Sequence, residues 1–240
     1  MTDLTGKVAV VTGGSKGIGR AIARSLCDVG ADVALCSRRE PEATEAAAEL
    51  SSGGGGRVLG IAADVRQLED VKQLIATAVA EFGGLDILIA NAGVGGGFGP
   101  VDEIEPETWH QVIDTNLTGV YHCCHAAVPE LKRRGGGWVI TIASLAGRYA
   151  FAGGTAYNAS KFGLLGFTEA LMLDLRDHGI RVSCVMPGSV DTHFNGRERS
   201  GESWKLAPDD VARAVMQLLA HENRALPSRV ELRPSRPQRS

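Results

Sequence analysis

A tyrosine and a lysine stand four residues apart, at Tyr157 and Lys161, in a stretch whose pattern predicts a helix from Thr155 to His178. Residues four apart in a helix emerge on one face, so the phenol and the ammonium are expected to be neighbours. A free phenol has a pKa of about 10, and a nearby ammonium stabilises the phenolate. We therefore predict that Lys161 lowers the pKa of Tyr157. Such a phenol can give a proton to a carbonyl oxygen or take one from an alcohol.

A tyrosine and a lysine at this spacing also occur as an ordinary surface pair, so the prediction depends on which other residues are expected beside them. Ser144 lies two residues beyond the predicted strand Trp138–Ile142. A hydroxyl placed near a strand end can stabilise the charge that develops on a reacting oxygen. Ser144, Tyr157 and Lys161 are accordingly predicted to be catalytic residues.

A glycine-rich turn, Thr12-Gly13-Gly14-Ser15-Lys16-Gly17-Ile18-Gly19, joins a predicted strand to a predicted helix near the N-terminus. Glycines let a backbone approach a diphosphate closely, and a helix N-terminus offers free N–H groups and a partial positive charge. The spacing G-x-x-x-G-x-G differs from the G-x-G-x-x-G dinucleotide fingerprint, and alone it is compatible with a plain tight turn. The residues predicted to bind phosphate here are Gly13, Ser15, Lys16, Gly17, Ile18 and Gly19.

The residues after the second predicted strand indicate which nicotinamide cofactor is bound. Enzymes that use NAD carry an acidic residue about twenty positions beyond the glycine-rich turn, where it binds the ribose 2′-hydroxyl. This chain has Ser37 and Arg38 there, and Lys16 supplies a second positive charge from the turn. Arginine pairs with phosphate through its planar fork. We predict NADP (as NADPH) in preference to NAD, with a solvated basic loop as the alternative interpretation.

Short β-branched runs alternate with amphipathic stretches along the whole chain. This alternation predicts a parallel sheet with right-handed crossovers, which binds ligands at the carboxyl ends of its strands. The predicted strands are Lys7–Thr12, Asp32–Cys36, Arg57–Ala63, Asp86–Ala90, Trp138–Ile142, Arg181–Met186 and Val230–Leu232. The predicted helices are Gly17–Val29, Pro41–Ser51, Leu68–Phe82, Pro106–Arg134, Thr155–His178 and Ala207–Ala220.

Bulk properties exclude several classes of protein. The 240 residues carry a net charge of −3, which gives no basic footprint for nucleic acid. No apolar run is long enough to span a bilayer, and the N-terminus does not resemble a signal peptide, so we expect a cytoplasmic protein.

The five cysteines include no C-x-x-C pair and are predicted to be buried thiols. The run His122-Cys123-Cys124-His125 could suggest a metal, but no further ligand has matching spacing, so none is predicted.

Taken together, the separate motifs are specific. The glycine-rich turn, Asn91-Ala92-Gly93, Ser144 and Tyr157-x-x-x-Lys161 stand in the order and spacing of the short-chain dehydrogenase/reductase family, which this chain resembles from Gly6 to about Thr192. It is similar to 3-oxoacyl-acyl-carrier-protein reductase-like members. The resemblance implies a single α/β domain over residues 1–232, a Rossmann-type doubly wound parallel sheet with helices on both faces. Residues 233–240 are expected to form a frayed tail.

The resemblance also implies roles for individual residues. Lys161 would hold the nicotinamide ribose as well as assist Tyr157, and Asn116 would hold a proton-relaying water. The remaining implied cofactor contacts are Asp64 and Val65 at the adenine, Asn91, Ala92 and Gly93 beneath the adenine ribose, Pro187, Gly188 and Val190 beside the nicotinamide, and Thr192 at its carboxamide.

The predicted function is the NADPH-dependent reduction of a carbonyl, either a ketone or a 3-oxoacyl thioester, with Tyr157 as proton donor. The alternatives are an NAD-dependent alcohol or sugar dehydrogenase on the same scaffold and a catalytically silent NADP-sensing or interaction protein. The expected partners are a small-molecule carbonyl or alcohol substrate, or an acyl thioester, and further copies of the chain. The short lid at Gly196–Leu206 and the absence of a D-G-G terminus depart from many relatives, so both a homodimer and a homotetramer are compatible with the sequence.

Overall fold

The computed structural model describes residues 3–194 and 201–236, and its centre is a parallel sheet of seven strands in the order β3-β2-β1-β4-β5-β6-β7. The order reverses between β1 and β4, as in a doubly wound sheet. The strands are β1 (Val8–Thr12), β2 (Asp32–Ser37), β3 (Val58–Ala62), β4 (Ile87–Ala90), β5 (Gly137–Ile142), β6 (Ile180–Pro187) and β7 (Arg229–Leu232). The predicted α/β class and all seven predicted strands are confirmed, with ends that move by at most one residue.

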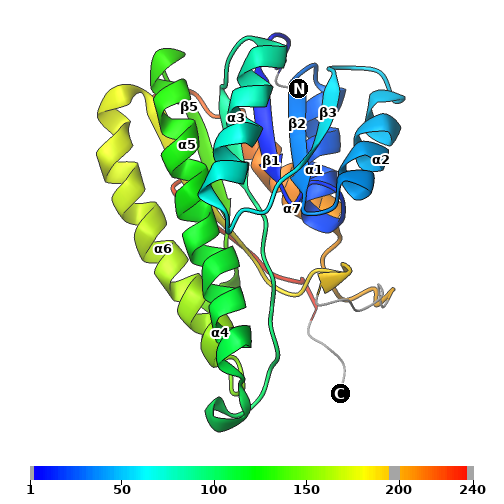
Figure 1. Ribbon diagram of the computed structural model, residues 1–240. Coiled ribbons are helices and arrows are strands. Elements are labelled where there is room, and N and C mark those ends of the chain that lie inside the picture. Colours follow the sequence, from blue (N-terminus) through cyan, green and yellow to red (C-terminus); the bar gives the residue numbers. More distant parts are fainter. Residues whose placement is uncertain (1–2, 195–200, 237–240) are drawn as a thin grey trace.

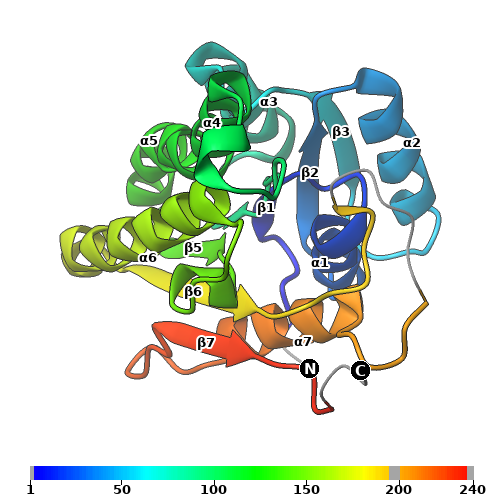
Figure 2. The same ribbon diagram turned by 90° about the horizontal axis from the view of Figure 1, so that it is seen from below.

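Helices cover both faces of the sheet (Figures 1 and 2). Side chains alternate along β1: Ala9 and Val11 join the apolar core beneath α1, α2 and α7, whereas Val10 joins the core beneath α3, α5 and α6. A strand buried on both faces must be apolar throughout, which is why its five residues carry no charge. The helices are α1 (Gly17–Asp28), α2 (Glu40–Ser51), α3 (Leu68–Phe82), α4 (Pro106–Ile113), α5 (Gly119–Arg133), α6 (Thr155–Leu175) and α7 (Pro208–Leu219).

The predicted single helix Pro106–Arg134 is wrong in one respect. Between α4 and α5 the chain makes a π-helical turn, η2 (Asp114–Thr118), which contains the buried Asn116. A π turn inserts one extra residue into a helix and is often found at functional sites. The 3.6-residue pattern of apolar side chains resumes after the insertion, so the sequence pattern does not reveal it.

The C-terminal segment returns to the sheet. β7 pairs in parallel with β6 at the edge of the sheet, and Gly188 N donates to Leu232 O at 2.8 Å. Arg233, where a frayed tail is predicted to begin, lies over the Tyr149 ring at 4.8 Å and pairs with Glu231. Residues 237–240 of that tail, and residues 196–200 of the predicted short lid, lie outside the described residues.

Over residues 3–194 and 201–236, no helix is both long and apolar enough to cross a membrane.

Candidate active site

The glycine-rich turn is fastened to β4 by Asn91. Its side-chain amide donates to the carbonyl oxygens of Thr12 at 2.8 Å and of Gly13 at 3.2 Å. In return, the Thr12 hydroxyl accepts from the backbone N–H groups of Asn91 and Ala92, each at 3.0 Å. Two neighbouring strand ends are thereby held together at the point where the strand order reverses. Asn91 and Ala92 therefore lie directly against the turn, as the resemblance implies.

The turn has the shape of a phosphate cradle. Gly13 and Gly17 have φ angles of +63° and +57°, a backbone region that favours glycine. A Cβ on Gly19 would stand 2.2 Å from the carbonyl oxygen of Gly13, so the start of α1 packs against the turn only as glycine. In the described part of the chain, no side chain caps the N-terminus of α1 at Lys16. Its uncapped N–H groups suit an anionic diphosphate, and the residues present fit a nicotinamide dinucleotide.

Tyr157 and Lys161 lie in the first two turns of α6, and both approach the end of β5. The Lys161 ammonium donates to the carbonyl oxygen of Ile142 at 3.1 Å and lies 5.7 Å from the centre of the Tyr157 ring. Ser144 stands two residues beyond Ile142; it hydrogen-bonds with Tyr157, and its hydroxyl also accepts from Ala146 N at 3.1 Å. The structure thus brings together the three residues that the sequence places around a reacting oxygen.

The predicted lowering of the Tyr157 pKa is wrong for this structure. Burial raises the pKa of Tyr157 above its ordinary value, and the hydrogen bond with Ser144 only partly opposes the rise. Lys161 does not reverse it, because its ammonium bonds to a backbone carbonyl and burial lowers its own pKa to about 8. Burial is the largest cause of the pKa shift for each of the two groups.

Asn116 connects the π turn to α6 and to the loop after β4. Its side-chain oxygen accepts from Val94 N at 2.8 Å, and its amide donates to Val94 O at 2.8 Å and to Ser160 Oγ at 3.1 Å. The Ser160 hydroxyl in turn bonds to the carbonyl oxygen of Tyr157 at 2.8 Å. A Cβ on Gly93 would lie 3.3 Å from Asn116 Oδ1 and 3.8 Å from Lys161 Nζ. Asn116 and Gly93 therefore border the catalytic group, and the side chain of Asn116 is a positioning element.

The segment after β6 closes the other side of the turn. A Cβ on Gly17 would lie 3.4 Å from the Thr192 methyl group, so Thr192 stands beside the start of α1. A Cβ on Gly188 would meet Leu145 at 3.1 Å, next to Ser144. Val190 forms a bridge with Leu206, where the chain returns toward α7. Pro187, Gly188, Val190 and Thr192 thus run from the catalytic serine toward the phosphate turn.

Two of the residues predicted to select the cofactor, Ser37 and Lys16, are engaged by the carboxylate of Glu42. Ser37 donates to Glu42 at 3.0 Å, and Lys16 lies 3.8 Å from the same carboxylate. Asp64 forms a two-pronged ion pair with Arg66, which lowers the pKa of Asp64. Val65 is buried: the ring nitrogen Nδ1 of His122 lies 3.0 Å from its carbonyl oxygen, and its side chain packs beside Gly119. Of this group, Asp64 is placed at the strand end, and Val65 packs beneath α5.

Sequence reasoning missed several residues around Tyr157. The rings of Phe98 and Phe194 meet the Tyr157 ring edge-on, with centroids 6.1 and 5.9 Å away, and Phe151 meets Phe98 at 5.5 Å. All three phenylalanines are more than a third exposed. Asn158 donates to Ala146 O at 2.7 Å and so fixes the loop that carries Ser144. Neither Phe98 nor Phe194 stands in a motif that would single it out.

The run from His122 to His125 belongs to the core and its border. Cys123 and Cys124 are on the buried face of α5, and burial raises the pKa of the Cys124 thiol to about 12. His122 contacts Val65, and His125 stacks with the exposed Tyr121. Among the described residues, no group of three or more His, Cys, Asp or Glu side chains could hold a metal ion.

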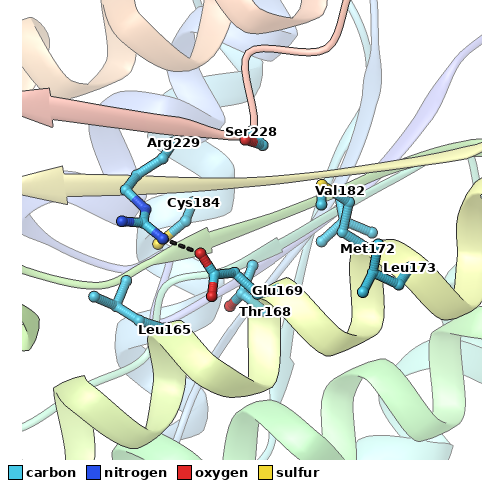
Figure 3. A pocket seen from close by; sticks show the side chains of 9 residues that line it. All are labelled: Leu165, Thr168, Glu169, Met172, Leu173, Val182, Cys184, Ser228 and Arg229. Carbon is cyan, nitrogen blue, oxygen red and sulfur yellow. Dashed lines mark hydrogen bonds and ion pairs between the residues drawn. The ribbon is translucent and has the colours of Figure 1, made fainter.

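A cavity of about 210 Å³ lies elsewhere, between α6, β6 and the start of β7 (Figure 3). Glu169 and Arg229 form an ion pair across it, and Cys184 lies behind them. It contains none of the predicted site residues. Its first α6 residue, Leu165, is eight positions beyond Tyr157, or about 12 Å along the helix. This cavity is separate from the catalytic group.

A doubly wound parallel sheet, a glycine cradle at its switch point and the group of Tyr157, Lys161 and Ser144 at a strand end together define a nicotinamide-dependent oxidoreductase. The comparisons with known proteins give the family. The family model for short chain dehydrogenase matches residues 7–203, and this chain belongs to that family of enzymes.

Three relatives illustrate the similarity. Dehydrogenase/reductase SDR family member 4 of Oryctolagus cuniculus is 41% identical over 80% of this chain and 74% of its own length. An alcohol dehydrogenase from the archaeon Thermococcus sibiricus, complexed with 5-hydroxy-NADP, has a TM-score of 0.90 at 32% identity, covering 97% of this chain and 99% of that chain. A 3-ketoacyl-(acyl-carrier-protein) reductase from Brucella melitensis, complexed with NADH, has a TM-score of 0.89 at 27% identity over 97% and 99% of the two chains.

Proposed function

We propose that this oxidoreductase uses NADPH to reduce the carbonyl group of a ketone or a 3-oxoacyl thioester to a hydroxyl, with Tyr157 as the proton donor. The observation that carries the proposal is the group of Tyr157, Ser144 and Lys161 at the end of β5. Burial raises the pKa of Tyr157, so its phenol is protonated at neutral pH and can act as an acid. That state suits reduction, in which the carbonyl oxygen must receive a proton.

Each residue has a distinct task in this mechanism. A bound reduced nicotinamide supplies hydride to the carbonyl carbon. Tyr157 donates its proton to the carbonyl oxygen, and the Ser144 hydroxyl hydrogen-bonds to that oxygen as it gains charge. Lys161 stays near the phenol through its bond to Ile142 and stabilises the phenolate once the proton has left. The Asn116 side chain holds α6 in register with the loop after β4 through Ser160 and Val94.

The cofactor would lie along the carboxyl ends of β1, β4, β5 and β6. Gly13 to Gly19 would hold the diphosphate, Asn91 to Gly93 the adenine ribose, Asp64 and Val65 the adenine, and Pro187 to Thr192 the nicotinamide. Close approaches join the neighbouring parts of this path: Gly13 to Asn91, Gly93 to Lys161, and Gly17 to Thr192. Because Val65 is buried, its contribution to the adenine site would be the shape of the strand end and not a side-chain contact.

The preference for NADPH is supported by Ser37 and Arg38, which stand where an enzyme that uses NAD carries an acid, and by Lys16 in the glycine-rich turn. The archaeal alcohol dehydrogenase was solved with an NADP derivative and the Brucella reductase with NADH, so relatives of similar fold occur with both cofactors. An NAD-dependent alcohol or sugar dehydrogenase is therefore the second candidate. One observation favours it: Glu42 brings a carboxylate to Ser37.

The substrate-facing side of Tyr157 is apolar, with Phe98 and Phe194 against its ring. These side chains would exclude water from the carbonyl and contact the apolar part of a ketone or an acyl chain. We also propose a cytoplasmic location, supported by five buried cysteines without a disulfide in the described chain.

The experiment that tests the function measures dissociation constants for NADPH and NADH by fluorescence in one buffer, followed by a screen of ketones and 3-oxoacyl thioesters with the preferred cofactor. The proposal requires tighter binding of NADPH and turnover of at least one carbonyl class. Tighter binding of NADH would favour the second candidate. Binding of neither cofactor would favour a catalytically silent protein.

A further inference from the structure

Glu42 stands next to the position expected for the adenosine 2′-phosphate. It is the third residue of α2, where an acidic side chain is favoured by the positive end of the helix. Its carboxylate accepts a hydrogen bond from Ser37 Oγ at 3.0 Å, forms an ion pair with Arg39, and has one oxygen 3.8 Å from Lys16 Nζ. One carboxylate therefore contacts three polar groups at the predicted phosphate site.

The Ser37 hydroxyl has no proton left to donate to a second acceptor. A serine hydroxyl has one proton to donate, and Ser37 gives it to Glu42 while its oxygen accepts from Arg39 N at 3.2 Å. Ser37 is only 8% exposed, so water is poorly placed to substitute. The hydroxyl cannot donate to a phosphate and to Glu42 at the same time. A 2′-phosphate would have to displace the carboxylate to gain this bond.

The negative charges around Ser37 also disfavour a 2′-phosphate. A phosphate monoester carries close to two negative charges at neutral pH, and a neighbouring carboxylate repels it. The turn and α2 border a shallow hollow lined by Ser15, Lys16 and Arg20 on one side and by Glu42, Glu45 and Glu49 on the other. Lys16 and Arg20 already face carboxylates there, in ion pairs with Glu42 and Glu49. Arg38 stands outside these pairs and acts on the charge of Asp64.

We propose that Glu42 determines the cofactor preference as an internal competitor of the adenosine 2′-phosphate. In the unliganded protein its carboxylate contacts Ser37, Lys16 and Arg39. These contacts must break for NADPH to bind. NADH has a hydroxyl at the same place and leaves these contacts intact. Glu42 therefore weakens the binding of NADPH and not that of NADH. This inference rests on the proposed role of Lys16, Ser37 and Arg38 in recognising NADPH.

The test compares dissociation constants of NADPH and NADH for the wild type, Glu42→Gln and Glu42→Ala. Glu45→Gln is the matched control, because Glu45 lines the same hollow on the same helix and its loss removes the same charge. Both Glu42 variants are expected to tighten NADPH by about tenfold, the effect of roughly one charge-assisted contact. The NADH constant should stay within about twofold, which also shows that the variants are folded. Glu45→Gln should change NADPH binding by less than about threefold.

An unchanged NADPH constant in both Glu42 variants would overturn the inference. So would weaker NADH binding in both, because Glu42 would then bind the adenosine ribose. The wild-type ratio of the two constants tests the proposed function separately. If the wild type prefers NADH and Glu42→Gln still tightens NADPH, the proposed NADPH dependence fails and the role of Glu42 stands.

Discussion

Tyr157 and Lys161 show how burial changes a pair of side chains that a helix brings together. Each residue lies in the first turns of α6 near the end of β5, where Lys161 is buried and Tyr157 is partly buried. Desolvation disfavours the charged form of either group, so the pKa of Tyr157 rises and that of Lys161 falls to about 8. In the unliganded protein the pair is poised with the proton on the phenol.

Replacing Tyr157 by phenylalanine should abolish turnover and leave cofactor binding intact, because only the proton donor is lost. We expect the rate to fall by about 10²- to 10⁴-fold, the usual contribution of a positioned acid. The measurement is kcat with an accepted carbonyl substrate, beside the NADPH dissociation constant. Tyr149→Phe is the control, since Tyr149 is exposed and lies against Arg148 and Arg233. Turnover near that of the wild type would remove Tyr157 from the mechanism.

Lys161 should give a measurable pH dependence of stability. Its pKa is 10.5 when unfolded and about 8 in the fold because of burial. Between these values the unfolded chain binds more protons, so the stability of the wild type relative to Lys161→Met should rise with pH. The cost of burying the charge, about 3 kcal/mol, is fully present below pH 8 and fades toward pH 10.5.

The measurement for Lys161 is urea unfolding of the wild type and Lys161→Met at pH 7 and pH 10, without cofactor. Lys161→Met should have a larger free energy of unfolding than the wild type at pH 7, and most of this difference should disappear at pH 10. Lys132→Met, at an exposed position on α5, should show no such change in its difference from the wild type. A constant difference for Lys161→Met would mean that its ammonium is not desolvated.

At the scale of elements, β4 is held to β1 and to the end of α5 by one buried carboxylate. Asp86 precedes β4 and accepts hydrogen bonds from Val8 N at 3.0 Å, Lys7 Nζ at 3.0 Å and Arg134 Nε at 3.2 Å. Burial raises the pKa of Asp86, but these three donors lower it more in sum, so it lies below its ordinary value. β4 then delivers Asn91 to the glycine-rich turn.

Asp86→Asn should lower the free energy of unfolding by roughly 1–2 kcal/mol at pH 7, since it removes the charge from a buried acceptor while its cationic partners Lys7 and Arg134 remain partly exposed to water. Chemical unfolding monitored by circular dichroism measures this, with the exposed Asp28→Asn as a control that should change stability little. The folded pKa of Asp86 is lowered, so its stabilisation is present above pH 4 and is lost as the pH falls. A loss that does not shrink in acid would contradict this assignment.

At the scale of the whole molecule, one helical face remains apolar. Trp109 on α4, Tyr121 on α5, and Phe162 and Leu173 on α6 are each more than a third exposed. In Figure 1, α4 continues the line of α5, and α6 runs alongside them on the same side of the molecule. Large apolar side chains exposed on neighbouring helices are typical of an interface. We propose that a second copy of the chain covers it, as part of a homodimer or homotetramer.

A charge in the middle of this face should separate the subunits. Phe162→Asp is expected to shift the protein toward monomers in size-exclusion chromatography with light scattering, because an aspartate cannot be buried there without a partner. Ala48→Asp, at an exposed position on α2, adds the same charge outside the face and should keep the wild-type mass. A monomeric wild type would contradict the proposed assembly, and an unchanged mass for Phe162→Asp would place the interface elsewhere.

The amino-acid sequence alone determined the order of strands and helices and the motifs at their ends. Apolar runs such as that of β1 and the amphipathic stretch of α3 are local patterns, so their positions follow from the chain itself. The same holds for the glycine-rich turn, whose positive φ angles need glycine, and for Tyr157 and Lys161, which helical geometry places together.

Only the tertiary structure decided how those residues act. The π turn at Asn116, the bonds from Asn91 to Thr12, and the contact between Glu42 and Ser37 each join segments or adjust a helix in ways that no periodicity reveals. The direction of the Tyr157 pKa was decided likewise, because desolvation depends on how completely the fold surrounds the phenol and not on its neighbour four residues away. Short-range spacing selects which groups can meet, and packing decides their charge and their partners.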